Sequence, residues 1–175
     1  TRLREMSFLT KGLKITLHDE RAEGREDIFQ YDDGIKDFIA YLHSTGSKEP
    51  LHKKIVYFHE ETDHEEVEIA LQWNDSDQES LLSFANNINT HDGGTHLSGF
   101  RSALTRTMNA YARSSGLLKE KDKNLEGEDL REGITAIVSV KLQEPQFEGQ
   151  TKGKLGNPQM EGLVQQVTNR KLAEF

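Results

Sequence analysis

The fold of this chain is decided by residues 86–101, which read NNINTHDGGTHLSGFR. A strand-like run enters the double glycine, and helical spacing follows it, with Leu97 and Phe100 near one apolar stripe. Gly93 and Gly94 supply backbone angles that other residues resist, and Thr95 is placed to cap a helix by accepting a backbone N–H. The stretch therefore predicts a strand, a tight turn and a long helix over residues 95–112.

The neighbouring segments predict the remaining elements by their hydrophobic period. Alternation typical of strands occurs at residues 13–19, 25–31, 55–58, 67–73 and 81–86, and a buried strand is expected at 133–142. Helical spacing occurs at residues 2–9, 35–42, 127–132 and 158–175. Strands in meander order followed by helix, strand and helix predict an α+β fold, with helices covering one face of a mixed sheet. We expect one domain over residues 1–175.

Composition describes a soluble globular protein. The chain has 175 residues, 34% hydrophobic and 30% charged, and no apolar run approaches the roughly 20 residues of a membrane helix. The absence of cysteine excludes disulfides and thiol catalysis, and fits a cytoplasmic location. A net charge of −8 argues against a protein whose whole surface binds nucleic acid. However, residues 93–119 contain no acid and carry Arg101, Arg106 and Arg113, which leaves a local DNA-facing surface open.

A second informative segment is the loop at residues 147–157, with the sequence FEGQTKGKLGN. Its glycines and polar residues follow Pro145, so we expect an irregular surface loop. Such a loop can present the Lys152 ammonium, a compact charge on a long stem, to an anion.

In order, these motifs resemble the ATPase subunits of type II DNA topoisomerases, and most of all the DNA gyrase B family. The matching segments are GGTH at 93–96, GFR at 99–101, QTK at 150–152, REMSFL at 4–9, YDDGI at 31–35 and ALQWND at 70–75. Their order along nearly the whole chain is far more specific than any one short motif. The resemblance is to the second domain of that protein, called the transducer.

The resemblance implies a fold and a set of roles. The implied fold is that of ribosomal protein S5 domain 2, including a left-handed βαβ crossover. Residues 1–9 would be the end of a helix that comes from the preceding ATPase domain. Lys152 would contact the γ-phosphate of ATP bound in that domain, with Gln150 assisting. Arg101 would line the DNA-transit cavity. Mg²⁺ would be used by the full-length subunit. The partners of that subunit would be double-stranded DNA and the gyrase A subunit, and no contact with a membrane is expected.

Several alternatives remain open. One is the B-type subunit of topoisomerase IV, which shares the segments at residues 86–101 and 147–157. The other belongs to a different functional class: an S5-like nucleic-acid-binding module without an ATP role.

The His91, Asp92 and His96 triplet lacks the spacing of a helix-borne zinc pair, so we expect no metal site there. The acidic residues 60–66 lack a calcium-loop pattern and are expected to form a solvated turn.

Overall fold

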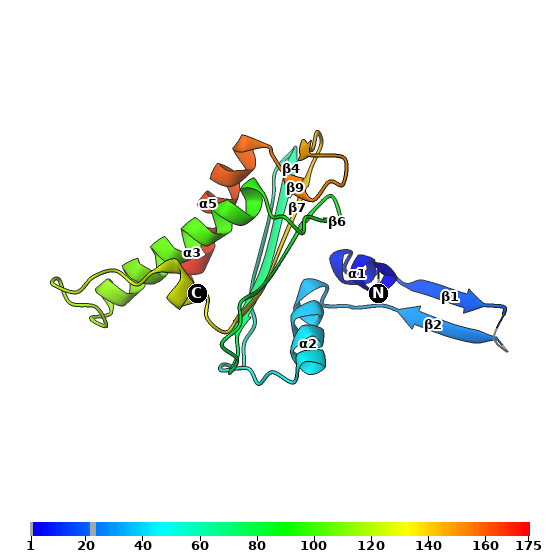
Figure 1. Cartoon of the computed structure of the whole chain (residues 1–175), viewed down its shortest axis with the longest axis horizontal. Coiled ribbons are helices and arrows are strands. Elements are labelled where there is room, and N and C mark those ends of the chain that lie inside the picture. The colour runs from blue at the N-terminus through cyan, green and yellow to red at the C-terminus, as the bar shows by residue number, and fades with distance from the viewer. Residues whose placement is uncertain (1, 22–23) are drawn as a thin grey trace.

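The structure, a computed structural model, describes residues 2–21 and 24–175. Its centre is a five-stranded mixed sheet with the strand order β3-β4-β7-β5-β6 (Figure 1). The strands span Val56–Glu61 (β3), Glu65–Trp73 (β4), Ser80–Ala85 (β5), Ile88–Asn89 (β6) and Ile134–Leu142 (β7). Strands β5 and β7 are parallel, and all other pairs in this sheet are antiparallel.

Helices cover both faces of this sheet, not the one face that the sequence predicted. On one face, α3 (Thr95–Ser114) and α5 (Pro158–Ala173) pack on a cluster that includes Ala136 and Val138 of β7. On the opposite face, α1 (Arg2–Leu9) and α2 (Ile35–Gly46) pack on a cluster that includes Ile137 of the same strand. Because β7 is buried at nearly every position and successive side chains alternate between faces, both of its sides are covered.

A long crossover joins the parallel strands β5 and β7. The connection runs through β6, α3 and α4 (Gly127–Arg131), as parallel neighbours require. The structure confirms the predicted α+β class with a mixed sheet and packed helices, as in the S5-like fold. The left hand expected of the crossover stays a prediction.

The strands β1 (Ile15–Asp19) and β2 (Arg25–Phe29) form a separate antiparallel hairpin. In Figure 1 this hairpin extends away from the main sheet, beyond α1. Leu17 and Ile28 are exposed on it. The hairpin is tied to the body through α1, where the Phe8 ring stacks on Tyr31 and Phe38 at centroid distances of 3.8 and 4.5 Å.

The expected helices and strands are all present, with shifted ends. Two short strands missed by the sequence reading, β8 (Phe147–Glu148) and β9 (Lys154–Leu155), pair to form the base of the Lys152 loop. A strand of two residues is too short to show an alternation of apolar and polar residues, so the hydrophobic pattern could not predict this pairing.

Among the described residues, none of the helices combines the length and the apolar character that crossing a membrane would require.

Candidate functional site

Lys152 lies on an exposed loop between β8 and β9, as predicted, and Gln150 is exposed on the same loop. Lys152 has φ 56°, in the left-handed region, which costs a non-glycine residue roughly 1 kcal/mol. Its Nζ lies 5.9 Å from the centroid of the Phe147 ring. Within residues 2–21 and 24–175, no carboxylate lies within ion-pair distance of this ammonium. The cation is therefore held out on a bent loop without an internal counter-ion.

The Lys152 loop is docked on the glycine turn at residues 90–94. The Asp92 N–H donates to the Gly153 carbonyl at 2.8 Å, and the Leu155 N–H donates to the Gly93 carbonyl at 3.1 Å. Gly94 and Leu155 also form a parallel β-bridge. Two segments far apart in sequence thus form one backbone-bonded unit, which we call the docked loop.

Close backbone approach explains the glycines of the GGTHLSG motif. A Cβ on Gly94, which has φ 138°, would lie 2.4 Å from the Leu155 carbonyl oxygen. A Cβ on Gly99 would lie 2.4 Å from the carbonyl oxygen of Glu161 on α5. Real Cβ atoms are not found at such distances. Gly94 therefore permits loop docking, and Gly99 permits α3 to lie directly against α5.

A buried hydrogen-bond chain lies beneath the turn. The Ser83 and Thr90 hydroxyl oxygens are 2.7 Å apart, and Thr90 Oγ1 lies 3.0 Å from His96 Nε2. Burial lowers the pKa of His96 to about 4, so the ring is neutral at pH 7. His91 and Asp92 instead pair at the exposed surface, with 3.3 Å between Nε2 and Oδ2. The predicted reading of residues 91–96 as a structural turn fits this arrangement better than a zinc site.

The predicted N-cap role of Thr95 is wrong. Gly94 occupies the cap position of α3 without a side-chain hydrogen bond, and Thr95 is the first helical residue. Its hydroxyl is buried with no hydrogen-bond partner among the described residues. The non-helical backbone at Gly94 starts the helix one residue earlier than a Thr95 cap would.

Four arginines line one groove of about 630 Å³ on the outer side of α3. Their spacing of five and seven residues along a helix places Arg106 and Arg113 on nearby faces with Arg101 displaced, which by itself predicts no tight basic stripe. The groove nevertheless includes all three, together with Arg131 from α4. The short helix α4 contributes this fourth cation, which no spacing along α3 could have indicated.

A shared carboxylate holds two of these cations. Glu79 accepts hydrogen bonds from Arg101 Nη2 at 2.7 Å and from Arg131 Nε at 2.8 Å. Burial alone would raise the pKa of the Glu79 carboxyl, but the bonds from Arg131 and Arg101 outweigh burial and lower it. Glu79 and Arg131 were missed by sequence reasoning because both lie far along the chain from Arg101.

Arg113 is used within the protein. Its guanidinium donates to Asn124 Oδ1 at 2.7 Å and to the carbonyls of Lys119 and Asp122 at 3.1 and 2.9 Å. These bonds hold the loop that follows α3. Arg113 is therefore primarily a structural residue at one end of the groove.

Comparison with known proteins places the chain in a family. The family model described as DNA gyrase B matches residues 34–175. The DNA gyrase B subunit of Clostridium acetobutylicum is 53% identical over 99% of this chain and 27% of its own length. The corresponding protein of Myxococcus xanthus is 51% identical over 99% of this chain and 21% of its own length. The chain thus spans about a quarter of the length of these relatives.

Solved structures agree with the sequence comparison. The 43K ATPase domain of Thermus thermophilus gyrase B, solved with an aminocoumarin, superposes with a TM-score of 0.87 and 40% identity. The match covers 99% of this chain and 46% of that one. A topoisomerase IV ATP-binding domain from Francisella tularensis, at 22% identity and a TM-score of 0.80, shares the fold. With the family model matching most of its residues, this chain belongs to the DNA gyrase B family.

Proposed function

We propose that this chain is the transducer region of a DNA gyrase B subunit, which couples ATP binding and hydrolysis in an adjacent ATPase domain to DNA strand passage and supercoiling. The observation that carries the proposal is the docked loop. It presents Lys152 to the outside without an internal counter-ion among the described residues, on a segment whose position is set by backbone hydrogen bonds. A cation prepared in this way is suited to an anion supplied by another domain.

In this proposal the anion is the terminal phosphate of ATP. Lys152 contacts the γ-phosphate, Gln150 assists from the same loop, and the nucleotide with its Mg²⁺ is bound mainly by the preceding domain. Because the lysine loses its partner when the phosphate leaves, it reports the nucleotide state. The hydrogen bonds from the loop to the turn at residues 90–94 then link that state to α3.

The arginine groove supports a contact with double-stranded DNA. The Arg101 side chain is partly exposed, and Arg106 lies in the same groove without an ion pair to any of the described residues. Clustered guanidinium groups bind phosphates without reading sequence, which suits a passing duplex. Partners in the full enzyme are the ATPase domain of the same subunit and the gyrase A subunit.

The domain assignment is also a proposal. Residues 1–175 act as one transducer unit, with residues 158–175 as its C-terminal helix and residues 1–9 as the end of a helix from the ATPase domain. The exposed apolar residues of the β1–β2 hairpin suit a contact with that domain.

Replacement of Lys152 by Ala in the full subunit, assayed with its A-type partner, tests the proposal. We expect ATP turnover to fall by roughly a hundredfold or more, the scale for losing one preorganised charge at a transition state. Nucleotide affinity should fall less. Lys154→Ala is the matched control, because Lys154 is paired with Glu148 at 3.1 Å and should change turnover little. A Lys152→Ala enzyme with normal hydrolysis and supercoiling would refute the sensor role.

The same assay separates the alternatives. Introduction of negative supercoils with a gyrase A subunit favours gyrase, and decatenation without supercoiling favours the topoisomerase IV assignment. If Lys152→Ala has no effect but the 175-residue chain binds DNA in a salt-dependent manner, the S5-like nucleic-acid module is favoured, for which the arginine groove is the supporting observation.

A further inference from the structure

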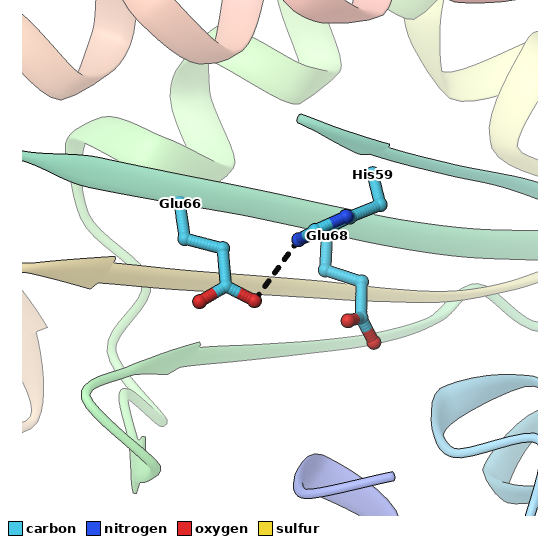
Figure 2. A group of neighbouring side chains, drawn as sticks. All are labelled: His59, Glu66 and Glu68. Atoms are coloured by element: carbon cyan, nitrogen blue, oxygen red, sulfur yellow. Dashed lines mark hydrogen bonds and ion pairs between the residues drawn. The ribbon is translucent and has the colours of Figure 1, made fainter. Parts of the chain in front are cut away.

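His59, Glu66 and Glu68 form a cluster on strands β3 and β4 of the main sheet, far from the docked loop in sequence. One ligand atom of each lies within 4.8 Å of the others. Figure 2 shows the two carboxylates on one side of β4, with the imidazole of β3 reaching toward Glu66. The His59 Nε2 to Glu66 Oε1 distance is 3.1 Å.

The sheet holds these side chains in register. His59 and Glu68 are directly opposed Cα partners in the antiparallel β3–β4 pair. Glu66 is two residues from Glu68, so it lies on the same face. All three groups therefore come from paired strands, not from the acidic turn at residues 62–64, and their positions require no loop rearrangement.

The charges at this cluster are incompletely balanced. Lys141 of β7 donates to Glu66 Oε2 at 3.2 Å, which offsets one carboxylate and fixes its orientation. Glu68 has no ion-pair partner within residues 2–21 and 24–175. Two carboxylates and one imidazole whose ligand atoms lie within 4.8 Å of one another favour a cation that all three can share.

We propose that His59, Glu66 and Glu68 bind a first-row divalent transition-metal ion such as Zn²⁺. One imidazole nitrogen and two carboxylate oxygens are a ligand set that these ions accept. Metal bonds of about 2.0 to 2.2 Å place ligand atoms no more than about 4.4 Å apart, so a small rotation of one carboxylate closes the site. His59 and Glu66 have side-chain exposures of 37% and 22%, which leaves room for water at the remaining positions.

The proposal is independent of the Lys152 sensor role. A bound ion would cross-link the edge strand β3 to β4 and so stabilise the sheet on the face that α1 and α2 cover only in part. This effect has a direct readout, because an ion that binds only the folded chain raises its melting temperature with concentration.

The test is a titration of the 175-residue chain with Co²⁺, followed by visible absorption, and with Zn²⁺, followed by calorimetry and thermal melting. We expect one ion per chain, a d–d absorption band and a higher melting temperature. His59→Gln and Glu68→Gln should each weaken binding by at least about tenfold, since even the loss of an outer-shell partner costs roughly 10 to 100-fold.

His64→Gln is the matched control, because His64 is exposed on the neighbouring turn and is not one of the three proposed ligands. It should bind Co²⁺ as the unaltered chain does. Circular dichroism establishes that each variant is folded before titration. No absorption band in the unaltered chain, equal binding by His59→Gln and Glu68→Gln, or an equal loss in His64→Gln would each overturn the site.

Discussion

The docked loop and the arginine groove both present cations along α3, but they hold them in opposite ways. Lys152 has no carboxylate partner within the described part of the chain, and its loop is positioned by backbone bonds to the glycine turn. Arg101 and Arg131 share Glu79, and Arg113 bonds to a following loop. In the proposed function, the loop therefore binds one external charge, whereas the groove, partly neutralised, makes many weak contacts.

The largest expected effect comes from breaking the docking of the loop. Gly94→Ala should destabilise the chain by about 3 kcal/mol, because the new Cβ meets the backbone of Leu155. Urea denaturation measures this change. Gly149→Ala is the control: its φ is also positive, at 77°, but nothing lies within 4 Å, so about 1 kcal/mol of backbone strain is expected. Equal losses in the two variants would show that docking contributes nothing.

Acid should weaken the same unit through His96. The pKa of His96 is about 4 in the fold, below the ordinary value of 6.5, so between these values the unfolded chain binds the additional proton. Stability is therefore full above pH 6.5 and falls as pH drops, by about 2 kcal/mol at pH 5. Urea denaturation at about pH 7 and pH 5 measures this loss. His96→Gln should flatten the dependence, whereas exposed His91→Gln should preserve it, and equal stability of the unaltered chain at both pH values would contradict the assignment.

Removal of a cation from the arginine groove should weaken the response to DNA and leave nucleotide binding unchanged. In the full subunit, Arg101→Ala should lower DNA-stimulated ATPase activity while basal activity and ATP binding are retained. Loss of one phosphate contact should also reduce the slope of log affinity against log salt by about 1. Unchanged stimulation across a series of salt concentrations would remove Arg101 from the DNA surface.

The smallest expected effect is that of Glu79→Gln, which frees two arginines of the groove. The Arg101 side chain is 45% exposed, so loss of the ion pairs should cost less than about 1 kcal/mol. Because the pKa of Glu79 is lowered in the fold, its contribution is present above the unfolded pKa and disappears as pH falls through the folded pKa. Denaturation at neutral and acid pH measures it, with Glu132→Gln as the control, because Glu132 is exposed and has no ion pair with the described residues. DNA affinity should rise in Glu79→Gln, and a fall would indicate that Glu79 positions the arginines productively.

Local patterns predicted most of the fold because the elements are long and strongly periodic. The run at residues 133–142 became the central strand β7, and the spacing after Gly94 became α3. The same patterns failed where an outcome depended on distant neighbours. One apolar face of β7 is readable in its sequence, but the other carries Thr135, Ser139 and Lys141 beside Ile137, so cover on one face was wrongly expected.

By itself, the sequence determined the α+β class, the exposed lysine loop, the glycine turn and the resemblance to the DNA gyrase B family, because each depends on local residue patterns or on the order of such patterns along the chain. Tertiary structure alone decided that the loop bonds to the turn, that Glu79 joins Arg101 to Arg131, and that His59 faces Glu66 and Glu68. Such contacts depend on strand register and on the packing of helices. These are properties of the whole fold, since hydrogen bonds and charges act over a few ångströms of space whatever the separation along the chain.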